Sequence, residues 1–90
     1  MEKTKLIQVL KGVKEVQSRT GLTYQILSVT NDTILFKRSE VSECEKLSLE
    51  ELLDFINSNK PVTTTNAREY ISGRKQSPAV AIVDKIKTMI

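Results

Sequence analysis

The stretch Leu-Thr-Tyr-Gln-Ile-Leu-Ser-Val-Thr-Asn-Asp-Thr-Ile-Leu-Phe-Lys-Arg, residues 22–38, decides the fold that this sequence predicts. Two runs rich in β-branched and aromatic residues, Leu22–Val29 and Thr33–Arg38, lie on either side of Asn31-Asp32. Asn and Asp adopt positive φ more readily than most residues, so this pair suits a tight two-residue turn. The pattern therefore predicts an antiparallel hairpin.

The two-residue turn also predicts the register, and so which side chains share a face of the hairpin. One face has an apolar patch that includes Leu27 and Phe36, and we expect it to meet helices. The other face carries Tyr24, Ile26 and Leu35, so it is not expected to be fully exposed. If that face stays exposed in the monomer, it predicts binding of another protein or of a second copy. The predicted pairs are Val29 with Ile34, Leu27 with Phe36, and Gln25 with Arg38.

The residues before the hairpin have the apolar spacing of a helix. From Lys3 to Gln17 the apolar residues recur every three or four positions, which predicts an amphipathic helix ending at Ser18 to Gly21. Gly12 lies inside this helix, where glycine costs about 1 kcal/mol relative to alanine. After the hairpin, Cys44–Leu47 is expected to form a third short strand. The apolar positions of the helix are Leu6, Val9, Leu10, Val13 and Val16.

The sequence predicts the N-termini of three helices after the hairpin. Ser48 and Glu51 form a capping box, and the helix that they begin is expected to stop at Asn57 to Pro61. Asn66 with Glu69 predicts a short helix through Ser72, and Gly73 suits a left-handed conformation after it. Ser77 followed by Pro78 predicts the start of a last helix. The expected fold is a single α+β domain over residues 1–90: a helix, a hairpin or three-stranded meander, then three helices, the last two forming a helix-turn-helix-like corner.

The composition excludes several kinds of chemistry. The chain has no histidine and a single cysteine, which rules out an internal disulfide, a Cys/His zinc site and histidine-based catalysis. The three glycines, at positions 12, 21 and 73, do not have the spacing of a Walker or dinucleotide-binding phosphate loop. Glu43-Cys44-Glu45-Lys46 has residue types of a metal-dependent nuclease at the wrong spacing, and we interpret it as edge-strand charge. We therefore expect neither an enzyme nor a cofactor, and a buried or half-buried Cys44.

The longest apolar run, Ala79–Val83, is far too short to span a membrane, and we expect a cytoplasmic protein with no membrane partner. The net charge is +3. It divides into +4 for residues 1–39, −5 for residues 40–58 and +4 for residues 59–90. A polyanion would thus be attracted to one face and repelled from another, unless these charges pair with each other in the fold.

The corner before the last helix is the one candidate site. Arg74 and Lys75 place positive charge just before a helix N-terminus, which favours phosphate. A helix-turn-helix reader would instead have a small residue at Glu69 and an apolar one at Arg74, and Ala79–Val83 is too apolar to read bases. Two hypotheses stay open. One is weak, non-specific nucleic-acid binding at this corner; the other is a protein-interaction or regulatory domain that binds another protein or a second copy through the apolar first helix or the second face of the hairpin. The candidate nucleic-acid-binding residues are Arg68, Arg74, Lys75, Gln76, Ser77 and Lys85.

Overall fold

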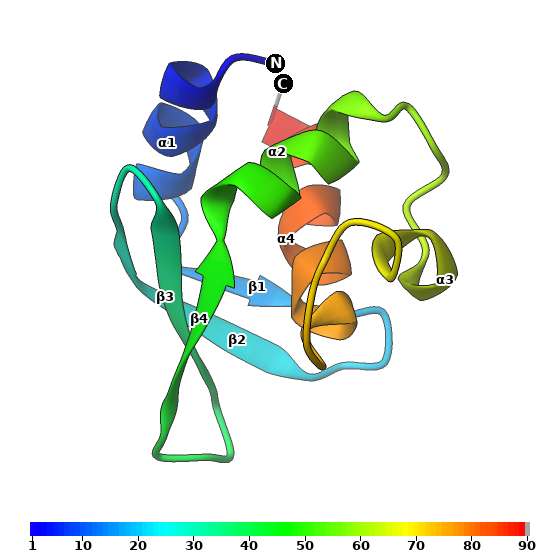
Figure 1. The fold of residues 1–90 in the computed structure, drawn as a ribbon. Coiled ribbons are helices and arrows are strands. Elements are labelled where there is room, and N and C mark those ends of the chain that lie inside the picture. Colours follow the sequence, from blue (N-terminus) through cyan, green and yellow to red (C-terminus); the bar gives the residue numbers. More distant parts are fainter. Residues whose placement is uncertain (90) are drawn as a thin grey trace.

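The computed structural model describes residues 1–89, which form an α+β domain with a four-stranded sheet (Figure 1). This is the predicted fold class, with one strand more than the sequence predicted. The elements are α1 (Lys3–Lys11), β1 (Glu15–Gln17), β2 (Thr23–Val29), β3 (Thr33–Arg38), β4 (Cys44–Ser48), α2 (Leu49–Asn57), α3 (Thr64–Ala67) and α4 (Gln76–Met89).

The sheet is an antiparallel meander in which the strands follow in chain order, β1-β2-β3-β4. Helix α4 lies at the centre of the domain, in contact with β1 and with each of the other three helices (Figure 1). Every residue from Pro78 to Val83 is buried, as is Ile86. The last helix is therefore a core helix, as its apolar sequence predicted. No helix within residues 1–89 has the length and hydropathy needed to cross a membrane.

The first helix is shorter than predicted. It ends at Lys11, and Gly12 closes it with its amide donating to the carbonyl oxygen of Val9. The chain then continues as β1, where Val16 is buried opposite Tyr24 of β2. Val16 fits the helical spacing and the alternation of a strand equally well, so only pairing with β2 distinguishes the two.

The hairpin of β2 and β3 forms as predicted, but its register is only partly correct. Val29 pairs with Ile34, whereas Phe36 pairs with Ile26 rather than with Leu27. Between Ile26 and Ser28 the ladder shifts by one residue, so Leu27 is the extra residue of a β-bulge. The predicted pairing of Gln25 with Arg38 is likewise wrong.

Beyond the bulge this shift exchanges the two faces of β2. Tyr24 pairs with Arg38 and is fully buried, while Gln25 is exposed. Ile26 is half-buried against the core, and Leu35 is half-buried on the opposite side of the sheet. Tyr24, Ile26 and Leu35 therefore do not form one exposed surface, so the condition for binding through that face is not met.

The turn between β2 and β3 does not use positive φ. Asn59 is the one non-glycine residue with positive φ in the described part of the chain, so Asn31 and Asp32 do not adopt it. Instead, the hydroxyl oxygen of Thr30 accepts from the amides of Asp32 at 3.3 Å and Thr33 at 3.1 Å. A threonine side chain thus stabilises the turn that the sequence assigned to backbone conformation.

Helix α2 starts where the sequence predicted, whereas α3 and α4 start earlier. Ser48 caps α2 as predicted, accepting from the amide of Glu51 at 3.3 Å. Helix α3 is capped by Thr63 rather than Asn66 and ends at Ala67, well before Ser72. Helix α4 begins at Gln76, one residue before the predicted cap.

Candidate nucleic-acid interface

The corner before α4, residues 72–75, is held against α2 by Glu51. The carboxylate Oε1 of Glu51 accepts from the amide of Ser72 at 3.2 Å and from its hydroxyl at 3.0 Å. Glu51 was expected to reach back to the Ser48 amide, and its carboxylate is turned to the corner instead. Gly73 has φ +73°, a conformation that glycine adopts without steric cost, as predicted.

Two further side chains bind the carbonyl groups of the corner. Gln76 Nε2 donates to the carbonyl oxygens of Ile71 at 3.2 Å and of Gly73 at 2.6 Å. From the sheet, Arg38 Nη2 donates to the carbonyl oxygen of Arg74 at 3.4 Å. The backbone of the corner is thus fixed by contacts from α2, from β3 and from α4.

Arg38 itself is held in place by its neighbours. Its Nε donates to Glu45 Oε2 at 2.7 Å, and this hydrogen bond raises the pKa of Arg38. Its guanidinium carbon lies 5.8 Å from the centre of the Tyr24 ring. Because Arg38 is fixed on the sheet, its bond to Arg74 ties the corner to the sheet as well.

The positive charges of the corner are not neutralised by ion pairs. Arg68 and Arg74 are exposed and Lys75 is half-buried, and none of them takes part in an ion pair within residues 1–89. Ser77 is exposed at the start of α4. Arg74, Lys75 and Ser77 are close together in the chain, whereas Arg68 lies at the end of α3. The ion pairs are Lys3–Asp32, Arg19–Asp84, Arg38–Glu45 and Lys60–Glu69.

Two of the predicted site residues do not join the corner surface. The amide nitrogen of Gln76 is committed to the two carbonyl groups described above, so it has little capacity left for a ligand. Lys85 lies nine residues along α4, roughly 14 Å further on at 1.5 Å per residue. It lines a different hollow, together with Glu15 and Gln17 of β1.

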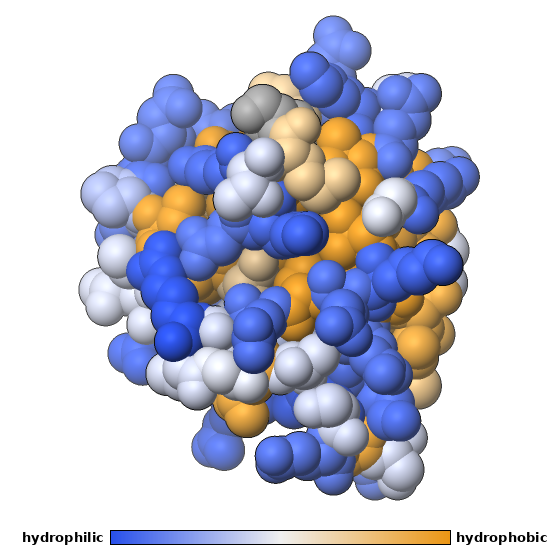
Figure 2. Space-filling model, turned by 180° about the vertical axis from the view of Figure 1, so that it is seen from behind, coloured by the Kyte–Doolittle hydropathy of each residue, from blue (hydrophilic) through white to orange (hydrophobic). Residues whose placement is uncertain are grey.

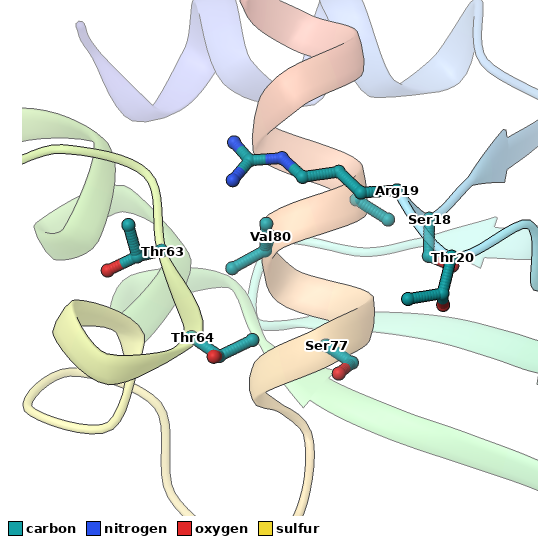
Figure 3. A pocket seen from close by; sticks show the side chains of 8 residues that line it. Ser18, Arg19, Thr20, Thr63, Thr64, Ser77 and Val80 are labelled. Atoms are coloured by element: carbon teal, nitrogen blue, oxygen red, sulfur yellow. The ribbon is translucent and has the colours of Figure 1, made fainter.

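A surface pocket of about 250 Å³ lies beside the start of α4 (Figure 3). Three separate segments line it, and five of the lining residues carry hydroxyl groups. Figure 3 shows Thr63 and Thr64 on one side of α4 and Ser18 and Thr20 on the other, with Val80 and Ser77 on the helix between them. The lining residues are Ser18, Arg19, Thr20, Thr63, Thr64, Ser77, Val80 and Ala81.

Arg19 is the one charged residue that lines this pocket, and Asp84 of α4 holds it. Its Nε and Nη2 donate to the two carboxylate oxygens of Asp84 at 2.9 and 3.0 Å. The hydrogen bond to Asp84 raises the pKa of Arg19. Because the charge of Arg19 is paired, the pocket offers hydroxyl groups rather than net positive charge.

Sequence reasoning missed the hydroxyl residues contributed by the turn before β2 and by α3. The run Thr63-Thr64-Thr65 was visible, but its use as a helix cap and pocket wall depends on the packing of α3 against α4. Ser18 and Thr20 lie more than 40 residues away from that run in the chain. No local signal brings these segments together.

The expected position of Cys44 was wrong, because this residue is exposed on β4. Edge strand β4 also carries Glu45 and Lys46 of the acidic stretch, and Glu45 is used in the ion pair with Arg38. In the described residues no three His, Cys, Asp or Glu side chains gather as they would around a metal ion.

Comparison with family models, with curated proteins and with solved structures found no match to this chain. The geometry of the corner is therefore the basis for assigning a function.

Proposed function

We propose that this domain is a small binding module that contacts the backbone phosphates of nucleic acid through the corner before α4. The observation that carries the proposal is the combination of a fixed backbone with unpaired cations. Side-chain hydrogen bonds from α2, β3 and α4 hold the corner, and Arg74 and Lys75 have no ion-pair partner within residues 1–89. A fixed loop loses little conformational entropy when it binds an anion.

The same geometry argues against reading of the base sequence. The residues of α4 that follow the corner, Pro78 to Val83, are all buried, so they are not available to base edges. Contacts from Arg74 and Lys75 to phosphate position a protein on nucleic acid but carry no sequence information. The acidic residues of the β3–β4 loop limit the surface open to a polyanion.

The test is fluorescence anisotropy of labelled single-stranded RNA and duplex DNA at increasing salt. Wild-type binding should weaken linearly on a logarithmic scale, with a slope of about −0.9 for each phosphate neutralised on duplex DNA. The double variant Arg74→Glu/Lys75→Glu should reduce this slope by about 2 and weaken binding to all sequences alike.

A matched control is Lys85→Glu/Lys87→Glu, which changes the net charge by the same amount on exposed residues near the end of α4, away from the corner. The control should bind more tightly than the corner variant. Equal loss in both variants would mean that net charge alone drives binding. Failure of the wild type to bind either nucleic acid at low salt would refute the proposal.

The second hypothesis, an interaction module, would need a surface other than the second face of the hairpin, because Tyr24 is fully buried there. A different exposed apolar surface is created by the bulge in β2.

A further inference from the structure

The bulge in β2 directs the side chain of one leucine, Leu27, toward solvent. Leu27 has no partner on β3, and 47% of its surface is exposed. A β-bulge breaks the regular ladder and re-aims a side chain, and bulges recur where such re-aiming has a use. Leu27 is thus a candidate contact residue.

Leu27 borders a groove of about 310 Å³ between the end of α1 and the edge of β2. Strand β1 pairs with β2 only from Thr23 to Gln25, so in the part of the chain described no strand lies beside Leu27 on that side. Figure 2, the view from behind, shows exposed hydrophobic surface near the middle and along one side of the molecule. The lining residues are Leu10, Lys11, Val13, Lys14, Ile26, Leu27, Ser28 and Val29.

Two lysines give this groove a positive rim. Lys11 and Lys14 are both exposed, and neither is a member of an ion pair within residues 1–89. A groove with apolar side chains and a lysine rim fits an acidic segment that presents an apolar side chain. Such an occupant would cover Leu27 and neutralise the two lysines.

The β3–β4 loop of the same chain has this chemistry. Val41 is 43% exposed and lies between Glu40 and Glu43, which are both exposed and form no ion pair among the described residues. The loop projects from the end of the sheet, away from the helices (Figure 1). The loop therefore lies too far along the hairpin to reach the groove of its own chain. It is accessible to the groove of a second copy.

We propose that two copies of this chain associate reciprocally, with Val41 of each copy on Leu27 of the other and Glu40 and Glu43 beside Lys11 and Lys14. A two-fold arrangement uses both contacts twice and closes the assembly as a dimer. Small interfaces of this kind bury less than about 1,200 Å² and are transient. The inference does not depend on nucleic-acid binding, because it involves neither Arg74 nor Lys75.

Sedimentation velocity over a range of concentrations tests the association directly. The wild type should shift from monomer to dimer, and added salt should weaken the dimer because salt screens exposed charges. Leu27→Asp and Val41→Asp should each raise the dissociation constant at least tenfold while circular dichroism stays that of the folded chain. Arg74→Glu/Lys75→Glu should still dimerise, which separates this proposal from the nucleic-acid proposal.

A charge exchange gives the sharper test. Lys11→Glu/Lys14→Glu makes both the groove and the loop acidic, whereas Glu40→Lys/Glu43→Lys makes both basic. Each variant alone should therefore remain a monomer. Their equimolar mixture should form a heterodimer, because each loop then meets a groove of opposite charge.

General attraction between oppositely charged chains is controlled with Lys85→Glu/Lys87→Glu, which has the same net charge as the acidic-groove variant. Because it keeps the wild-type groove and loop, this control should form its own homodimer. A fluorescently labelled Glu40→Lys/Glu43→Lys chain should nevertheless join far fewer dimers when mixed with the control than when mixed with the acidic-groove variant. A wild type that stays monomeric at millimolar concentration overturns the proposal and leaves an acidic segment of another protein as the occupant of the groove. Association that survives Leu27→Asp also overturns it, as does equal entry of the labelled Glu40→Lys/Glu43→Lys chain into dimers in both mixtures.

Discussion

Replacing Tyr24 by phenylalanine should stabilise this protein. Tyr24 is fully buried, and its hydroxyl group is the one buried side-chain polar atom that lacks a hydrogen-bond partner within residues 1–89. A buried polar group without a partner costs about 1–3 kcal/mol relative to water. Removing the oxygen while keeping the ring avoids this cost.

The ring contacts of Tyr24 do not need the hydroxyl group. The ring meets Phe36 edge-on, with centres 6.1 Å apart and planes at 77°, and the guanidinium of Arg38 lies 5.8 Å from its centre. Phenylalanine preserves both arrangements. We therefore expect Tyr24→Phe to raise the free energy of unfolding by about 1 kcal/mol, the low end of the range for an unpartnered group.

The same substitution should change the response to alkaline pH. Burial raises the pKa of Tyr24, with Arg38 opposing the shift and Glu45 adding to it. The folded chain then retains the phenol proton at a pH where the unfolded chain, with a pKa of about 10, loses it. The stability that this raised pKa contributes is fully present below the unfolded pKa, and it is lost as the pH rises through the pKa of the folded state. The Tyr24→Phe variant has no phenol group to ionise, so it should not lose this stability at alkaline pH.

Urea denaturation followed by circular dichroism at pH 7 and at pH 10.5 measures both effects. Tyr70→Phe is the matched control, because Tyr70 is half-buried and stacks on Phe55 with centres 5.8 Å apart. The control should change stability little at pH 7. A Tyr24→Phe variant that loses 1 kcal/mol or more at pH 7 would refute the reasoning, because the hydroxyl would then have a stabilising partner.

Three further substitutions test the fold. Phe36→Ala should cost about 3–5 kcal/mol of unfolding free energy, because the ring is fully buried. Leu35→Ala should cost much less, because Leu35 is half-buried, and urea titrations compare the two variants. Ser48→Ala should cost about 1 kcal/mol by removing the cap of α2, and an unchanged urea midpoint would contradict the capping role. Deleting Leu27 should keep the pairs on both sides of the bulge and shift stability by about 1 kcal/mol or less, while abolishing dimer formation in sedimentation; unfolding on deletion would show that the bulge is required.

The sequence by itself determined the elements that depend on local patterns. The hairpin, the capped start of α2 at Ser48 and the apolar last helix were all predicted, because alternation, capping residues and helical spacing act within a few residues of the chain. The positive φ of Gly73 is local in the same sense. The charge of Arg74 at an exposed corner was likewise predicted from its place before the helix.

Tertiary structure decided the assignments that depend on distant partners. Val16 became a strand residue because β2 pairs with it, although its spacing also suits a helix. The hydroxyl-lined pocket required the turn before β2 and the start of α3 to meet at α4. Glu51 turned from its expected capping role to Ser72, because the corner packs beside α2.

The faces of β2 show the physical reason most directly. A regular ladder from the turn would have placed Gln25 and Leu27 on the core face and Tyr24 in solvent. A one-residue bulge exchanges these faces, which buries Tyr24 against Phe36 and exposes Leu27. Alternation of side chains is the same in both registers, so the sequence pattern does not distinguish them. Burial of the larger aromatic surface against the helices does, and that surface exists only when the whole domain is folded.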